Sequence, residues 1–207
     1  MSDPWLNRWN ARYKEEAYAY GEEPNVYLKD QLTALPPGRI LFGAEGEGRN
    51  AIFAATFGWT VSAFDISIEG KKKAEQLAAS KGVSVDYRVG ELAELGFEEA
   101  SFDAIALIYA HFPPPIISSY HRLLSTYLKP GGHIILEAFG KNHLAYREKN
   151  PGVGGPPNLE ALFSVEGIQA DFPHFEVTEL AEVVVKLKEG LYHNGEGSVV
   201  RFFGRKQ

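Results

Sequence analysis

The chain has 207 residues, 44% hydrophobic and 23% charged, which is typical of a globular protein, and we expect residues 1–207 to form a single domain. The net charge of −6 argues against binding to a nucleic-acid backbone, and the lack of cysteine excludes disulfides and thiolate metal sites, so we expect no nucleic-acid partner and no metal. No apolar run approaches the length of a membrane span and the first residues do not resemble a signal peptide, so we expect a cytoplasmic protein without a membrane partner.

The N-terminal part of the chain is rich in aromatic side chains. Trp5, Trp9 and Tyr13 follow one another at a spacing of four. On a helix this spacing makes an apolar stripe, which most often packs against a core. We expect residues 1–37 to form a helical cap segment.

From residue 39 onward, short apolar runs alternate with helical patterns. We expect strands at residues 39–42, 60–64, 85–88, 104–108 and 132–138, and helices at residues 50–57, 68–80 and 116–127. On the second of these helices, the apolar side chains share one face, and we expect the solvated side to carry Lys71, Lys72, Lys73 and Glu75. Residues 128–132 are expected to end the third helix and to turn into the fifth strand. The alternation predicts an α/β fold with a parallel, doubly wound sheet.

The C-terminal part has a different pattern. Strand-like residues 176–187 and 198–204 are joined by a loop at residues 188–197 with three glycines and an Asn-Gly pair. Two strands joined in this way form an antiparallel hairpin. Before them, residues 140–157 are rich in Gly, Pro and Asn. An irregular stretch of this length is usually functional or mobile, and it is a candidate lid.

The first expected strand leads into the most informative motif of the chain, Ala44-Glu-Gly-Glu-Gly-Arg-Asn-Ala51. Glycine lets a backbone turn sharply against a ligand, and a strand, a glycine turn and a helix N-terminus together make a nucleotide site. Asp65 ends the second strand, 19 residues after Gly46, about where an acid would meet ribose hydroxyls. The motif also matches the dinucleotide fingerprint G-x-G-x-x-G/A, so an NAD(P)-binding oxidoreductase is one interpretation.

Two observations argue against a dinucleotide. Glu45 and Glu47 put carboxylates where a pyrophosphate with about two negative charges would sit. A terminal hairpin also leaves little room for a second nucleotide-binding half. S-adenosylmethionine (SAM) carries no phosphate, and its sulfonium and ammonium groups are compatible with acidic neighbours. The loop therefore favours SAM over NAD(P).

The chain resembles the class I SAM-dependent methyltransferases, in particular the group of the tellurite-resistance and thiopurine methyltransferases. The resemblance is carried, in chain order, by residues 44–51, 63–67, 101–104, 128–132, 135–139 and 189–195. It implies a Rossmann-like sheet of seven strands, mostly parallel with an antiparallel last strand. It also implies methyl transfer from SAM to a small-molecule acceptor, such as a thiol, a metalloid oxyanion or another soft nucleophile, with S-adenosylhomocysteine (SAH) as product. In related methyltransferases, the N-terminal segment covers the active site.

The chain also departs from the family pattern. The first family motif, D-x-G-x-G-x-G, falls on Phe42, Ala44, Gly46 and Gly48. A phenylalanine therefore replaces the acid and an alanine replaces the first glycine. Glu45 is the residue that could take over the role of the acid. Because of these changes, a catalytically silent SAM-binding protein remains an alternative.

The resemblance implies a set of cofactor-binding residues. Asp65 would accept hydrogen bonds from both ribose hydroxyls, although an Asp here could instead cap the next helix. Glu91, together with the backbone of Leu92, would contact the adenine amino group, or Glu91 could be a solvated acid at a helix start. The expected set is Tyr20, Gly21, Asn25, Ala44, Glu45, Gly46, Glu47, Gly48, Arg49, Asn50, Asp65, Ile66, Ser67, Gly90, Glu91, Leu92, Tyr109, Ala110 and His111.

Three residues are candidate catalytic residues. His111 follows the fourth strand, at the edge that forms the ligand crevice of an open α/β sheet, and it could be a general base or a neutral ring against the cofactor. Tyr192 and His193 lie in the hairpin loop, which reaches the same edge if the sixth strand runs parallel to the others. His143 and His174 lack such a placement, and we expect them at the surface. We expect a monomer or a weak homodimer.

Overall fold

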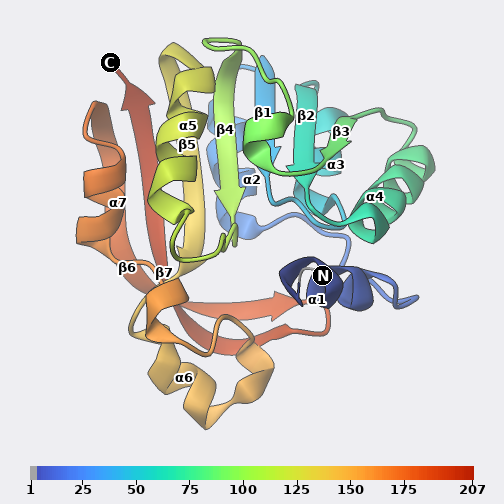
Figure 1. Ribbon diagram of the computed structural model, residues 1–207, viewed down its shortest axis with the longest axis vertical. Coiled ribbons are helices and arrows are strands. Elements are labelled where there is room, and N and C mark those ends of the chain that lie inside the picture. Colours follow the sequence, from blue (N-terminus) through green and yellow to red (C-terminus); the bar gives the residue numbers. More distant parts are fainter. Residues whose placement is uncertain (1–3) are drawn as a thin grey trace.

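The computed structural model describes residues 4–207 and contains one sheet of seven strands (Figure 1). The strand order is β3-β2-β1-β4-β5-β7-β6. The first five strands pair in parallel, and β7 is antiparallel to both of its neighbours. The sheet confirms the predicted Rossmann-like class with an antiparallel last strand. The strands are β1 Arg39–Gly43, β2 Thr60–Asp65, β3 Asp86–Val89, β4 Phe102–Ile108, β5 Leu128–Phe139, β6 Phe175–Glu189 and β7 His193–Lys206.

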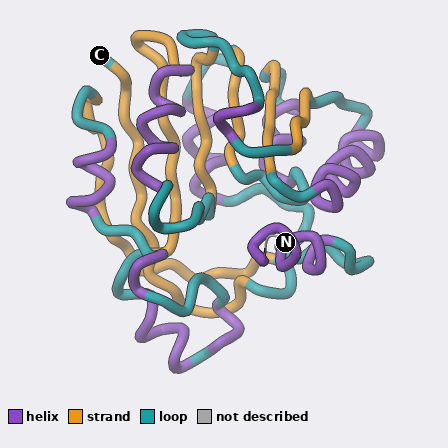
Figure 2. The backbone as a smooth tube through the Cα atoms, viewed as in Figure 1, coloured by secondary structure: helices purple, strands orange, loops and turns teal. Residues whose placement is uncertain are grey.

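Helices cover both faces of the sheet (Figures 1 and 2). One hydrophobic cluster joins the sheet to α2, α3 and α4, and a second joins it to α5 and α7. Among the described residues, no helix is both long and apolar enough to cross a membrane. The helices are α1 Pro4–Tyr13, α2 Val26–Ala34, α3 Arg49–Thr56, α4 Ile68–Lys81, α5 Ile117–Tyr127, α6 His143–Lys149 and α7 Val165–Asp171, with 3₁₀ turns at Leu92–Glu94, Pro151–Val153 and Leu159–Ala161.

The central strands explain where a ligand can enter. Ile40, Leu41 and Phe42 of β1 are fully buried, because β1 has a sheet neighbour on each side and helices on each face. The chain leaves β1 toward β2 on one side, whereas β4 lies on the other side. Such a reversal opens a crevice at the carboxyl ends of the two strands.

One of the side chains predicted to be solvated on α4 is buried. Lys73, expected to be solvated, is only 8% exposed. Its ammonium group forms an ion pair with Glu47 at 2.8 Å and donates to the carbonyl of Ala17 at 2.6 Å. The N-terminal segment lies over this part of α4, and a local pattern does not reveal such a distant partner.

The C-terminal hairpin is longer than predicted. Strands β6 and β7 pair from Phe175 and Lys206 to Glu189 and His193, so most of the expected loop at residues 188–197 is strand. Strand β5 pairs with β7 only up to Val199. The rest of the hairpin therefore extends beyond the sheet and curves below its carboxyl edge toward α1 (Figure 1).

The segment between β5 and the hairpin also differs from expectation. Residues 140–157 contain α6 and a 3₁₀ turn rather than one irregular loop. His143, expected at the surface, is fully buried. Its ring stacks on Phe139 at 4.0 Å, and its nitrogens bond to the backbone of Gly154 and Ser198. The ring fills the space between α6 and the hairpin, which are far apart in sequence. His174 is exposed, as predicted. Strand β5 begins at Leu128, directly after α5. Its pairing with β4 shifts register across residues 129–132, where a turn was expected.

Candidate ligand-binding site

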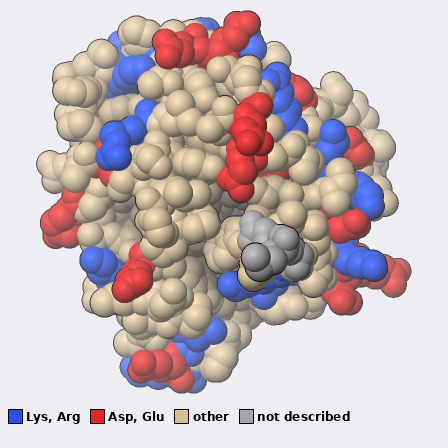
Figure 3. Space-filling view, in the orientation of Figure 1, with Lys and Arg blue, Asp and Glu red and all other residues tan. Residues whose placement is uncertain are grey.

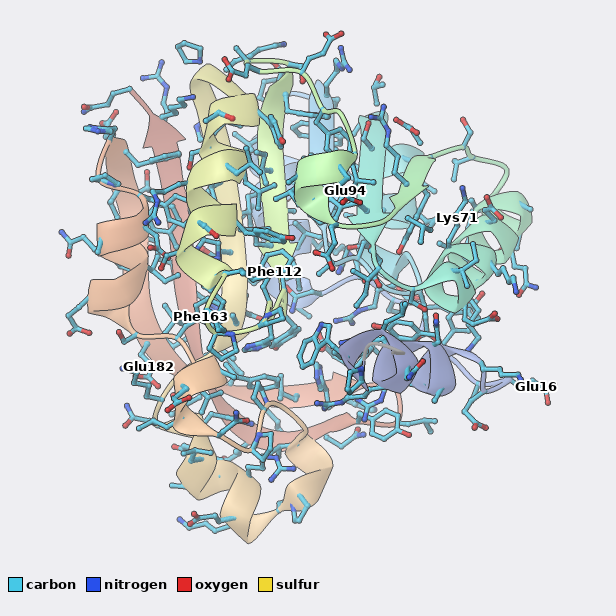
Figure 4. All side chains as sticks on the ribbon, viewed as in Figure 1. Glu16, Lys71, Glu94, Phe112, Phe163 and Glu182 are labelled. Carbon is cyan, nitrogen blue, oxygen red and sulfur yellow. The ribbon has the colours of Figure 1, made fainter. Side chains whose placement is uncertain are left out.

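A cavity of about 280 Å³ lies at the carboxyl ends of β1, β2 and β4. Helix α1 and the curved end of the β6–β7 hairpin form its other walls (Figure 1). Phe112, below the end of β4 in Figure 4, is one of several aromatic residues that line it. A closed space with apolar walls and a few polar groups is the usual form of a small-molecule site.

Most of the residues predicted for the cofactor line this cavity. Those that do are Tyr20, Gly21, Ala44, Glu45, Glu47, Arg49, Asn50, Asp65, Ile66, Gly90, Glu91, Leu92, Tyr109 and His111, together with the catalytic candidate His193. The predicted residues that lie outside the lining are Asn25, Gly46, Gly48, Ser67, Ala110 and Tyr192.

The glycine loop is shaped by contacts that only glycine allows. Gly46 has φ +60°, and a Cβ atom on it would lie 2.6 Å from the Tyr13 hydroxyl. Its N–H donates to the Asp65 carboxylate at 3.0 Å and its carbonyl accepts from the Tyr87 hydroxyl at 2.6 Å. Gly48, with φ +87°, is the N-cap of α3. These two glycines therefore set the course of the loop, although they do not line the cavity.

Asp65 lines the cavity and also holds the loop. Its second oxygen accepts from the backbone N–H of Ser67 at 2.8 Å. The N-cap of α4 is Ser67, whose hydroxyl accepts from Gly70. The capping role considered for Asp65 therefore falls to its neighbour. Burial raises the pKa of Asp65 to about 6, and hydrogen bonds from Ser67 and Gly46 oppose this rise.

Glu45 occupies the N-terminus of α3. One carboxylate oxygen accepts from the backbone N–H groups of Asn50 and Ala51, at 2.9 and 2.8 Å. Gly48 has no side chain to cap this helix, so Glu45 supplies the missing acceptor. Burial raises the pKa of Glu45 to about 7.

Glu47 and Arg49 connect the loop to other segments. Glu47 pairs with Lys73 and accepts from the backbone N–H of Ala19 at 2.8 Å. Arg49 forms an ion pair with Glu189 at 3.0 Å and donates to the carbonyl of Glu23. The two side chains thereby hold the N-terminal segment and the hairpin against the glycine loop.

The hairpin end brings a histidine–carboxylate pair to the cavity. Nδ1 of His193 lies 2.9 Å from Glu189, and the His193 side chain is almost fully buried. Burial lowers the pKa of His193, whereas bonds from His193 and Arg49 lower the pKa of Glu189 to about 2. A neutral ring that donates Nδ1–H to an ionised glutamate carries its lone pair on Nε2, and the ring lines the cavity.

His111 has a different arrangement from His193. Its Nδ1 donates to the carbonyl of Ala161 at 2.9 Å and its Nε2 accepts from the N–H of Phe139 at 3.4 Å. Burial lowers its pKa to about 4. Both nitrogens are thus engaged, which agrees with the neutral-ring alternative rather than with a general base. Tyr192 does not line the cavity; the guanidinium of Arg12 lies over its ring, 4.1 Å from the ring centre.

The sequence analysis missed a buried polar network beside the cavity. Glu137, only 2% exposed, accepts from the Tyr109 hydroxyl at 3.1 Å, from Asn25 at 2.7 Å and from Arg201 at 2.8 Å. Asn25 also donates to Glu189. A lone acid in the apolar run of β5 was the available signal, since a buried charge requires partners.

The comparisons with known proteins agree with this geometry. Residues 40–132 match the family model described as a methyltransferase domain. A ubiquinone biosynthesis O-methyltransferase of Xanthomonas campestris is 33% identical over 116 residues, which are 55% of this chain and 48% of that protein. The chain therefore spans about half the length of the curated relatives it matches.

Solved structures share the fold over most of the chain. A SAM-dependent methyltransferase from Methanosarcina mazei has a TM-score of 0.69 at 20% identity, covering 89% of this chain and 98% of that one. TehB from Haemophilus influenzae has a TM-score of 0.69 at 14% identity, covering 98% and 67%. Residues 40–132 are therefore similar to a methyltransferase domain, and the chain has the fold of solved SAM-dependent methyltransferases. At this identity the likeness to TehB shows the fold and does not identify the tellurite-resistance group.

Proposed function

We propose that this chain is a SAM-dependent methyltransferase that acts on a small-molecule acceptor, as a monomer or weak homodimer. The observation that carries the proposal is one cavity that joins the glycine loop and Asp65 to the Glu189–His193 pair. The methyltransferase-domain match covers the loop and Asp65. The Glu189–His193 pair lies on the C-terminal hairpin, outside the residues that match the methyltransferase domain.

The residues of the cavity fit SAM. Asp65 lines the cavity at the end of β2, where it would accept hydrogen bonds from the ribose hydroxyls. Glu91 and Leu92 line the cavity with Ile66, and they offer an acid, a backbone and an apolar surface for adenine. The loop at Ala44 would face the methionine part.

The same residues argue against NAD(P). A pyrophosphate binds to free N–H groups at a helix N-terminus. In this chain the N–H groups of Asn50 and Ala51 already donate to Glu45, and Gly46 donates to Asp65. A pyrophosphate would have to displace the two carboxylates from these N–H groups. It would then be repelled by their negative charges, which stay nearby. The dinucleotide interpretation is therefore disfavoured.

Methyl transfer is an in-line displacement that needs alignment and exclusion of water. SAM, when bound, supplies the electrophilic methyl group. The aromatic walls exclude water, and the Nε2 of His193 can accept a proton from an acceptor that must lose one. Glu189 stabilises the resulting imidazolium, and Arg49 keeps Glu189 ionised. The pair is useful only for a protonated acceptor, so we infer a hydroxyl or a thiol. A metalloid oxyanion would leave it unused.

Calorimetric titration with SAM, SAH and NADH tests the cofactor. We expect SAM and SAH to bind and NADH not to bind, and binding of NADH alone would overturn the proposal. Transfer from labelled SAM to phenols, thiols, selenite and tellurite tests the reaction. SAM binding without a product from any acceptor would identify a catalytically silent protein instead.

The Glu189–His193 pair can be tested separately by a substitution. His193→Asn should lower kcat for a hydroxyl acceptor by about 100-fold or more, within the usual range for loss of a general base, while SAM affinity stays unchanged. His174→Asn is the matched control, since His174 is exposed. Equal kcat values in the wild type and in His193→Asn would remove the histidine from the mechanism.

A further inference from the structure

Helix α1 presents one complete face to the cavity. Trp5, Arg8, Trp9, Arg12 and Tyr13 all line it, and their spacing of three and four residues puts them on one side of a helix. In an ordinary amphipathic helix this face would be apolar and packed on a core. Here it carries two arginines, so the wall opposite the sheet is cationic.

Both arginines are held in place by aromatic rings. The guanidinium of Arg8 lies 5.6 Å from the ring centre of Trp5 and 5.5 Å from that of Trp9. Arg12 lies over Tyr192 and donates to the hydroxyl of Tyr20 at 2.7 Å. Each guanidinium has five N–H donors, so most of these donors remain for a ligand.

Neither arginine forms an ion pair with a carboxylate of residues 4–207. The acids around the cavity are engaged elsewhere: Glu47 pairs with Lys73, and Glu189 pairs with Arg49 and His193. Figure 3 shows a strip of acidic side chains on the rim above the hollow, over the turn with Glu94 labelled in Figure 4, whereas basic side chains gather beside the N-terminal end of α1. The outer surface therefore differs in charge between the rim at Glu94 and the region beside α1.

Apolar side chains with rings also line the cavity. Phe139 and the prolines Pro156 and Pro157 line it together with the two tryptophans of α1. Such surfaces suit a planar ring. A guanidinium that is pinned by rings and has free donors suits a carboxylate or another planar anion.

We propose that α1 is an anion-binding wall of the cavity. The acceptor is then a planar aromatic molecule with a negatively charged group that Arg8 and Arg12 bind. This inference rests on the proposed methyltransferase function and specifies its substrate class. Two sources of the anion share this chemistry, the acceptor and the carboxylate of the cofactor. The geometry points to the acceptor, because the same face carries the tryptophans that a flat ring would contact.

The test uses two matched pairs of probes. One pair is 3-hydroxybenzoate and 3-hydroxybenzamide, and the other is 3-mercaptobenzoate and 3-mercaptobenzamide. Methyl transfer from labelled SAM gives kcat/KM for each probe in the wild type and in the variants Arg8→Gln, Arg12→Gln and Lys14→Gln. Lys14 is exposed on the same segment and does not line the cavity, so its variant is the control. We expect the wild type to prefer each acid over its amide by about tenfold or more. Either arginine variant should raise KM for the acid and lower this ratio severalfold, with Lys14→Gln unchanged.

Three results would overturn the proposal. The first is equal use of acid and amide by the wild type, and the second is an equal loss for both probes in the arginine variants. The third is weaker SAM binding in the arginine variants with an unchanged ratio, which assigns the arginines to the cofactor carboxylate. Calorimetric binding of each probe, with and without SAH, gives the acid-to-amide ratio even when no methyl group is transferred. A failure of the proposed methyltransferase function can thereby be distinguished from a failure of the proposal that α1 binds the anion.

Discussion

The buried charge of Glu45 makes a quantitative prediction about stability. Burial raises the pKa of this carboxyl from 4.5 to about 7. Above pH 7 the group is ionised in the folded and the unfolded chain, and the folded state bears the full cost of the buried charge. A shift of this size corresponds to about 3 kcal/mol, because one pKa unit is worth about 1.4 kcal/mol. Below pH 4.5 the group is protonated in both states and the cost vanishes.

Glu45→Gln removes the charge and keeps an oxygen that can accept from Asn50 and Ala51. The gain in the free energy of unfolding over the wild type should therefore grow as the pH rises. Between about pH 5.5 and about pH 8 we expect an increase of about 2 kcal/mol in favour of the variant. The charge of Asp65 is one cause of the raised pKa of Glu45, and the pKa of Asp65 itself is about 6. The difference therefore reports the charge of residue 45 together with its interaction with Asp65.

Urea unfolding followed by tryptophan fluorescence measures this difference at several pH values. Glu148→Gln, at an exposed position of α6, is the matched control, and its difference from the wild type should not change with pH. A Glu45→Gln difference that stays constant, or that turns against the variant as the pH rises, would refute the reasoning. It would mean that the ionised carboxylate stabilises the N-terminus of α3 by more than its burial costs.

Two further changes test the packing around the site. Gly46→Ala should destabilise the chain by about 1–3 kcal/mol, because its φ is +60° and the new Cβ would meet the Tyr13 hydroxyl. Gly58→Ala separates the two causes, since Gly58 has φ +90° but nothing within 4 Å of its Cβ position, and an equal loss would exclude the steric contact. Glu137→Gln should cost about 2 kcal/mol in urea unfolding, because it leaves Arg201 without its carboxylate. Adding Arg201→Gln should recover part of that loss, and a purely additive double variant would contradict the pairing.

Local sequence was enough to predict the sheet and many of the residues that line the cavity. The apolar runs of the buried strands and the glycine loop are contiguous in sequence, so their patterns identify them without knowledge of partners. Glu45 lies two residues after the end of β1 and Asp65 is the last residue of β2, so both lie at the carboxyl edge of the sheet, where they line the cavity. The confirmed hairpin likewise depends on two adjacent segments and their turn.

The features that the sequence did not predict depend on contacts between segments that are far apart in the chain. Lys73 and His143 are buried by partners that no local pattern announces. The Asn25–Glu137 hydrogen bond joins residues 112 positions apart. For the stripe of α1, the sequence allowed core packing as well as a cover over the active site, because one spacing serves equally for a core and for a cavity wall. Only the tertiary structure shows which of them the helix faces.

The backbone at the strand ends explains how the chain tolerates its departure from the family motif. Ala44, after β1, and Tyr109, after β4, both have positive φ, at 50° and 53°, although neither is glycine. Such conformations cost on the order of 1 kcal/mol each and persist only where neighbours enforce them. The N–H of Glu45 donates to the carbonyl of Phe64, and the Tyr109 hydroxyl and N–H both bond to Glu137.

Ala44 thus adopts the left-handed conformation that a glycine would adopt without strain. The substitution costs energy but keeps the course of the loop, and the adjacent Glu45 reaches the N-terminus of α3. Phe42, in place of the usual acid, is fully buried in the core beside α3. The carboxylate near this strand end is instead that of Glu45 on the loop, which caps the helix and lines the cavity. A loop built in this way keeps a carboxylate at the position where a phosphate-binding loop keeps free N–H groups, which favours a cationic ligand over a phosphorylated one.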